Sequence, residues 1–128
     1  MIIHKSIDIE EEVRTALEPH QKAYCRPLPA DYSLPNILVT QVGGTLTDKI
    51  DTFEVVLDSR AETEADALDY LNTAVAVLIR TAKEQTTALR HVVINTSGSW
   101  GADPVRPDLA MCSARLSVTA HQQLVEVK

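Results

Sequence analysis

The stretch Leu34–Gly44 reads Leu-Pro-Asn-Ile-Leu-Val-Thr-Gln-Val-Gly-Gly and sets the pattern for the rest of the chain. Pro35 cannot donate to a sheet ladder, so it suits the first residue of a strand. The aliphatic and β-branched side chains behind it favour a strand over Asn36–Val42. Gly43 and Gly44 close the run. Because glycine adopts positive φ readily, this pair predicts a sharp turn.

The segment that follows, residues 43–51, is polar except for Leu46 and Ile50. It is longer than a tight hairpin turn requires, so we expect a loop that projects from the body as an arm. A second strand is predicted at Asp51–Asp58. Phe53 and the odd-numbered residues after it share one apolar face of that strand.

Two helices are predicted on either side of these strands. The first runs over Asp8–Leu17, where Asp8 caps the helix and Pro19 ends it. The second runs over Glu64–Lys83 with Thr63 as its cap. Its apolar side chains recur every three or four residues, which indicates a helix that packs on a sheet. They are Leu68, Leu71, Val75, Leu78 and Ala82, with Ala67, Ala74 and Ile79 beside them.

Shorter patterns predict the remaining strands. Lys22–Arg26 fits an edge strand before a proline interruption, and His91–Thr96 fits a third main strand. Residues 97–108 contain glycines and prolines and are expected to form a second projecting loop. The run Cys112–His121 alternates strictly between apolar and polar side chains, so one face is buried and the other is polar. The expected core comprises Val13, Leu17, Val39, Phe53, Val55, Leu57, Leu71, Val75, Leu78, Ile94, Leu116 and Val118.

These periods are satisfied together by one α+β domain spanning residues 1–128. The expected architecture is a mainly antiparallel β-sheet of about four to five strands with two helices packed on one face. The predicted order along the chain is α-β-β-β-α-β-β. The loops 43–51 and 97–108 leave this body and are free to contact other molecules.

Charge and composition exclude several classes of protein. The chain has 128 residues, of which 45% are hydrophobic and 23% charged, and its net charge is −6. This balance argues against a protein that coats DNA or RNA, which needs a basic face. The acidity either serves solubility or suits a channel through which DNA passes without sticking. The first residues do not resemble a signal peptide and the apolar runs are too short to span a bilayer, so we expect cytoplasmic synthesis.

No pattern in the sequence indicates catalysis. His4, His20, His91 and His121 lack the spacing of metal ligands, and neither a phosphate-binding glycine loop nor a nucleophile elbow occurs. Two cysteines, at positions 25 and 112, fall in predicted strands and fit small buried hydrophobes without a disulfide. We therefore expect no enzyme activity, no cofactor and no metal.

Three side chains in the second half of the chain have two readings each. Trp100 is the only tryptophan, and in a loop it either covers the edge of its own core or anchors a partner, since tryptophan is enriched at interface hot spots. Arg106 and Arg115 serve either surface solvation or an ion pair between subunits. Arg115 projects from the polar face of the last strand, which favours the second reading for it.

Three blocks of the sequence resemble the tail terminator proteins of long-tailed, siphovirus-like phages and prophages. The first is Leu34-Pro35 leading through an apolar strand to Val42-Gly43-Gly44. The second is the strand Thr52–Leu57, followed by the junction Ser59-Arg60-Ala61 before an alanine-rich helix. The third is the alternating run Ala114–Thr119, in which Ala114 stands where many members carry proline. The similarity covers nearly the whole chain.

The resemblance implies a structural virion subunit at the junction of tail and neck. Members form a ring, commonly of six subunits, that ends polymerisation of the tail tube and joins the tail to the head-side connector. The implied partners are further copies of the chain, the major tail protein and the head–tail connector protein. DNA passes through the ring without specific binding, and no membrane is involved. The candidate contacts with subunits or tube are Gly43, Gly44, Leu46, Lys49, Trp100, Arg106 and Arg115.

Two other readings of the sequence stay open. Another neck protein, such as a head-closure or tail-completion subunit, has similar size and a similar mixture of helices and strands. A ferredoxin-like domain that binds a small ligand or serves regulation would have a formed pocket and be a monomer or dimer. An enzyme comes last, because no nucleophile, base and orienting group occur together.

Overall fold

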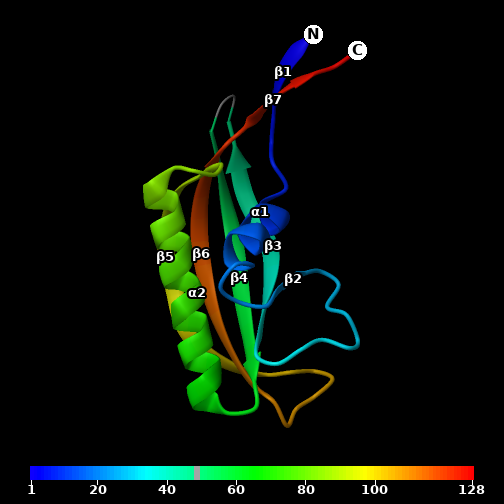
Figure 1. The fold of residues 1–128 in the computed structure, drawn as a ribbon, viewed down its shortest axis with the longest axis vertical. Helices are drawn as coiled ribbons and strands as arrows, with labels where there is room; N and C mark the ends of the chain where they lie inside the picture. Colours follow the sequence, from blue (N-terminus) through cyan, green and yellow to red (C-terminus); the bar gives the residue numbers. More distant parts are fainter. Residues whose placement is uncertain (48–49) are drawn as a thin grey trace.

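The computed structural model of the chain describes residues 1–47 and 50–128 (Figure 1). Over these residues the chain forms two helices and seven strands. They are β1 (Ile2–Lys5), α1 (Ile9–Leu17), β2 (Ala23–Cys25), β3 (Asn36–Leu46), β4 (Ile50–Ala61), α2 (Glu64–Glu84), β5 (Leu89–Ala102), β6 (Ala110–His121) and β7 (Gln123–Glu126). The α+β class is confirmed, but the order begins and ends with a strand that the sequence patterns did not predict.

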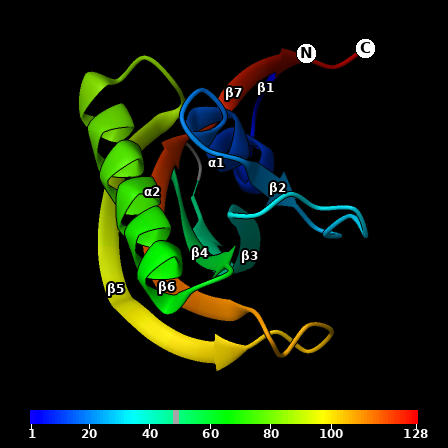
Figure 2. The same ribbon diagram turned by 60° about the horizontal axis from the view of Figure 1, so that its bottom comes forward.

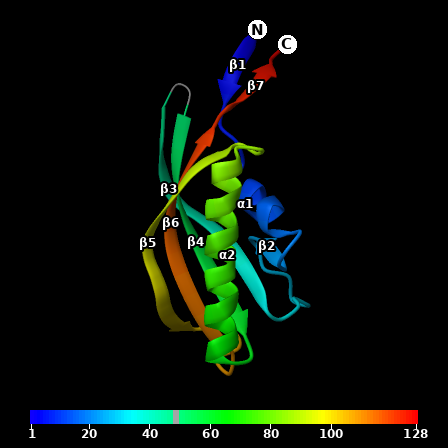
Figure 3. The ribbon, with the colours of Figure 1, turned by 60° about the vertical axis from the view of Figure 1, so that its left-hand side comes forward.

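Five of the strands form one sheet in the order β2-β3-β4-β6-β5. The β2–β3 pair is parallel, and the other neighbours are antiparallel. Both helices lie on the same face of this sheet (Figure 3): α1 contacts β2 and β3, while α2 crosses β4, β6 and β5. Figure 2 shows the sheet curving around α2. β1 and β7 pair with each other as a separate two-stranded ribbon.

Both helices begin where the sequence predicts. The Asp8 carboxylate accepts a hydrogen bond from the backbone N–H of Glu11 at 3.3 Å, and the Thr63 hydroxyl accepts one from Asp66 at 3.2 Å. Each cap satisfies a backbone donor that the first turn of a helix leaves free. α2 ends at Gln85, whose φ of 54° breaks the helical path. Within the described residues, no helix is both long and apolar enough to cross a lipid bilayer.

The core lies between the two helices and the sheet. All of the predicted core residues are buried except Ile94, which is 45% exposed. That prediction was wrong because Ile94 lies in β5, the edge strand, where no neighbouring strand covers its outer side. Leu68 was expected in the helix seam but is also exposed, on the flank of α2.

Both predicted loops are largely strand. Residues 43–46 continue β3, and Ile50 and Asp51 begin β4, so these parts of the predicted loop belong to two paired antiparallel strands. Residues 97–102 belong to β5, which leaves a loop of only 103–109 before β6. The sequence pattern failed here because β-bulges break the strict alternation that identifies a strand: they lie between Gln41 and Gly43 in β3 and at three points in β5.

Candidate assembly surfaces

The residues predicted to contact other subunits lie in separate parts of the molecule. In chain order they are Gly43, Gly44 and Leu46 of β3, Lys49, Trp100 of β5, Arg106 of the loop after β5, and Arg115 of β6. Lys49 lies outside the described residues. The described members do not form one site, so each surface is considered in turn.

The glycine pair of β3 has a different role from the predicted turn. Gly43 and Gly44 continue the strand, and the glycine with positive φ among the described residues is Gly98, at 78°. A Cβ at position 44 would lie 2.8 Å from the carbonyl oxygen of Thr52 on β4, whereas one at 43 meets nothing closer than 3.9 Å. Gly44 is therefore needed for the close approach of two strands, not for a turn.

Two β-ribbons project from the same end of the molecule (Figure 1): the β3–β4 hairpin and the β1–β7 ribbon. They carry large apolar side chains in solvent. Leu46 on the hairpin is 61% exposed, and Leu124 on the other ribbon is 68% exposed. Isolated exposed leucines are common on protein surfaces, but two neighbouring projections that both carry them indicate a surface for binding a partner.

A buried carboxylate connects the two ribbons to the body. Asp51 lies at the start of β4 and accepts hydrogen bonds from the Ser6 hydroxyl at 2.7 Å and from Gln122 Nε2 at 2.9 Å. Ser6 follows β1 and Gln122 precedes β7, so one side chain holds both strands of the second ribbon at the end nearer the body. No sequence motif pointed to this residue.

A second apolar surface follows the free edge of the five-stranded sheet. Trp100 is paired with Cys112 and Ile94 with Leu116, and both partners are buried on the helix-bearing face. Directly opposite residues share a face of a sheet. Trp100 and Ile94 therefore project from the helix-bearing side of β5, where they stay about half exposed. Trp100 belongs to a strand, in place of the predicted loop.

Leu68 of α2 extends this apolar surface. Tyr70 marks the α1 side of the helix, because its backbone carbonyl accepts from Gln21 Nε2 and its hydroxyl accepts from the backbone of Lys22. Residues two positions apart in a helix, such as Leu68 and Tyr70, are separated by about 200° around its axis. Leu68 therefore lies on the opposite flank of α2, toward β5. We call the set Leu68, Ile94 and Trp100 the β5 strip.

The backbone of β5 is irregular along this edge. Arg90, Asn95 and Gly98 are bulged residues that have no direct partner on β6. Bulges disturb the row of free backbone groups that another strand would pair with, and edge strands commonly use them to prevent open-ended sheet growth. A partner at this edge would consequently contact side chains of the β5 strip more than it would add a strand.

Arg115 lies on the helix-free face of the sheet and meets a carboxylate of its own chain. Its Nε is 3.8 Å from Glu54 Oε2, and both side chains are partly exposed. Glu54 also accepts hydrogen bonds from Ser117 at 2.7 Å and Asn95 at 3.1 Å. The pair contributes at most about 1 kcal/mol in water-exposed surroundings, and Arg115 retains exposed surface for a partner.

Arg106 lies in the short loop after β5 and pairs with Asp108 through two hydrogen bonds of 3.1 and 2.9 Å. Close by is a buried ion pair that the sequence analysis missed, between Arg60 Nε and Asp103 Oδ2 at 2.6 Å. Burial raises the pKa of Asp103, but hydrogen bonds from Arg60 and from the backbone N–H groups of Arg106 and Val105 outweigh it, so the pKa is lowered. The only sequence signal near this pair is the dipeptide Asp103-Pro104, which favours the start of a turn but does not indicate that Arg60 is the partner of Asp103.

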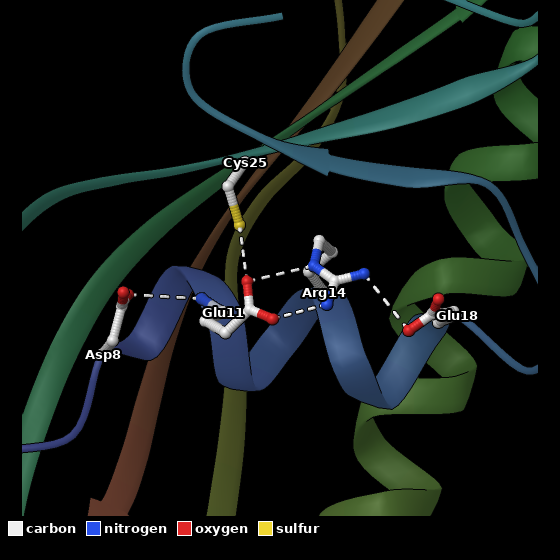
Figure 4. A network of polar contacts seen from close by, with 5 residues as sticks. All are labelled: Asp8, Glu11, Arg14, Glu18 and Cys25. Carbon is white, nitrogen blue, oxygen red and sulfur yellow. Dashed lines mark hydrogen bonds and ion pairs between the residues drawn. The ribbon is translucent and has the colours of Figure 1, made fainter.

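Cys25 is the more exposed of the two cysteines and belongs to a polar network with α1 (Figure 4). Its thiol lies 3.7 Å from Glu11 Oε2, and Glu11 in turn pairs with Arg14, which also contacts Glu18. Burial, followed by the charges of Glu11 and Glu10, raises the pKa of Cys25 to about 11. At neutral pH the thiol is protonated, so it is not an activated nucleophile.

In the described part of the chain, no group of three or more His, Cys, Asp or Glu side chains is placed to hold a metal ion. The chain matches no model of a known protein family and no curated protein.

Proposed function

We propose that this chain is a tail terminator subunit, a structural protein that forms a ring, ends polymerisation of a phage tail tube and joins the tail to the head connector. The observation that carries the proposal is the β5 strip, a tryptophan, an isoleucine and a leucine exposed beside a long free edge strand. The sequence blocks that resemble the family, and an α+β fold of the kind expected from them, support it.

A ring needs contacts in which one surface of a subunit meets a different surface of the next. The β5 strip suits one half of such a contact, because an aromatic and two aliphatic side chains gain free energy when they leave water. The bulges of β5 oppose open-ended strand pairing, which favours a closed assembly. By resemblance the ring has six copies. The net charge of −6 suits a passage for DNA.

The test compares two neighbouring residues of β5 on opposite faces of the sheet. Ile94 belongs to the β5 strip and is 45% exposed, while Val93 is 44% exposed and is paired with Ser117 on the helix-free face. Ile94→Ser is expected to weaken ring assembly on tubes of the major tail protein at least tenfold, since buried interface anchors contribute about 2 kcal/mol or more. Val93→Ser is expected to leave assembly unchanged.

Light scattering measures the mass of the complex, electron microscopy measures tube length, and urea unfolding checks each subunit. A wild-type chain that neither binds tubes nor limits their length would contradict the proposal. Binding to the head connector without any effect on tubes would indicate another neck protein instead. Equal effects of the two substitutions would show that the β5 strip is not the contact between copies.

A further inference from the structure

A cavity of about 580 Å³ lies at the end of the molecule opposite the two projecting ribbons. The segment before β3 and the loop 103–109 form its walls; they are the cyan and orange loops in Figure 1. Leu28, Leu34 and Val105 give it apolar sides. Its polar lining comes from Arg60, Asp103, Arg106 and Tyr32.

Arg60 carries hydrogen-bond donors that the chain does not use. Its side chain is less than one-tenth exposed, and its Nε donates to Asp103. Nη1 is buried without a hydrogen-bond partner, and no described residue accepts a hydrogen bond from Nη2. A guanidinium offers five N–H donors in a planar fork, so most of this fork is unfilled. Leaving buried donors unpaired is costly, which favours an acceptor in the cavity.

The other polar groups of the lining indicate which chemical group of a ligand would bind beside Arg60. The hydroxyl of Tyr32 is buried and has no hydrogen-bond partner. The Asp103 carboxylate is already engaged, with Oδ2 on Arg60 and Oδ1 on the backbone N–H groups of Val105 at 2.8 Å and Arg106 at 3.0 Å. The unfilled groups are therefore the N–H donors of Arg60 and the Tyr32 hydroxyl, which is able to donate. The two arginines of the lining each face a carboxylate, Arg60 on Asp103 and Arg106 on Asp108, so it is the unused donors of Arg60 that favour an acceptor.

We propose that this cavity binds a carboxylate carried on an apolar group. The carboxylate accepts from the Arg60 fork and the Tyr32 hydroxyl, because planar two-point contacts suit arginine and carboxylate. The hydrocarbon part packs against Leu28, Leu34 and Val105. Such a group occurs in a free branched-chain acid and in a glutamate flanked by apolar residues in a peptide. The proposal does not depend on ring formation.

The first experiment titrates isovalerate and its neutral counterpart isovaleramide into the ¹⁵N-labelled chain. NMR follows the side-chain Nε–H of Arg60 and the backbone amides of Val105 and Arg106. Isovalerate is expected to cause saturable shifts at these three signals. Isovaleramide has the same hydrocarbon but lacks the charge. It is expected to bind at least about tenfold more weakly, because hydrogen bonds to a charged group contribute about 1.5 kcal/mol or more.

Variants locate the binding. Arg60→Lys keeps the positive charge but removes the fork, so isovalerate should bind about tenfold more weakly. Arg80→Lys, on the exposed face of α2, should bind as the wild type does. Tyr32→Phe removes one donor and keeps the ring. It tests the cavity independently if Arg60→Lys does not fold, and it is expected to weaken binding severalfold.

Two results would overturn the proposal. One is an absence of saturable shifts with isovalerate, and the other is an equal response to isovalerate and isovaleramide, which would mean that the cavity does not recognise the carboxylate. The source of the carboxylate is identified by titrating a peptide with blocked ends, acetyl-Leu-Val-Glu-Val-amide, and its Glu→Gln form in the same way. Binding of the Glu peptide at least tenfold tighter than isovalerate indicates a peptide partner, whereas tighter binding of isovalerate indicates a free acid.

Discussion

Gly43 and Gly44 are neighbours in β3, yet they meet different surroundings across the hairpin. At position 44 an added Cβ would approach the Thr52 carbonyl oxygen at 2.8 Å and the Phe53 Cα at 3.3 Å, and both are backbone atoms that cannot rotate away. At position 43 the nearest atoms belong to the Glu54 side chain, at 3.9 and 4.0 Å. A glycine-to-alanine substitution therefore creates a clash with the β4 backbone at position 44 but not at position 43.

Gly44→Ala is expected to lower the free energy of unfolding by about 1–3 kcal/mol, because the hairpin strands must separate to admit the methyl group. Gly43→Ala should change it by less than about 1 kcal/mol, with a gain from reduced freedom of the unfolded chain offsetting any small loss. Urea unfolding at neutral pH measures both. If the two variants are equally stable, the spacing between β3 and β4 at Thr52 does not depend on glycine.

The Arg60–Asp103 pair makes stability depend on pH in a definite direction. The folded-state pKa of Asp103 is below its ordinary value, so in acid the unfolded chain binds more protons than the folded chain. Its contribution is fully present above the unfolded pKa of about 4 and is lost as the pH falls through the folded pKa. Asp103→Asn leaves Arg60 buried without its counter-charge, which should cost about 3–5 kcal/mol at pH 7.

The difference in unfolding free energy between wild type and Asp103→Asn should shrink as the pH falls below about 4, because the wild type loses its own contribution there. This difference is measured by urea unfolding at several pH values, in buffers without added salt. Asp108→Asn is the control: Asp108 pairs with Arg106 at the surface, so its loss should cost less than about 1 kcal/mol. A constant difference from pH 7 to pH 3 would show that Asp103 does not supply the pH dependence.

The helices and the inner strands were predictable because their signals are local and repeated. Asp8 and Thr63 are short polar residues before apolar periodic runs, and each caps a helix as expected. β4 and β6 are central strands, so their alternation is strict and the sequence reveals which face is buried. Leu68 shows where periodicity alone fails, since a helix on the edge of a sheet is only partly covered and its flank stays in water.

The edge strands were not predictable in the same way. β5 buries Leu89 and half-buries Val92, but bulged residues shift the phase, so its second half resembles a polar loop. β1 and β7 lie far apart in sequence and pair only with each other, with side chains that are mostly exposed. Neither β1 nor β7 shows the alternation of buried and exposed side chains by which a strand is recognised in a sequence. The Arg60–Asp103 pair likewise joins residues that only the tertiary fold brings together.

The two ends of the molecule are unlike. One end carries the β3–β4 hairpin and the β1–β7 ribbon with their exposed leucines, and the other carries the polar cavity around Arg60 (Figure 1). A subunit placed between a tube and a connector needs such polarity, because it must meet different partners in opposite directions. On the proposed function, the apolar ribbons are the better candidates for the tube, since both project beyond the body and can reach into a neighbouring assembly.

This placement predicts that the double variant Leu46→Ser, Leu124→Ser fails to cap tail tubes while its unfolding free energy changes by less than about 1 kcal/mol, since both side chains are more than half exposed. Val105→Ser is the matched control at the opposite end, where Val105 is 85% exposed. Tube length measured by electron microscopy should be uncontrolled with the double variant and normal with the control. Normal tubes with the double variant and uncontrolled tubes with Val105→Ser would mean that the subunit meets the tube with its cavity end.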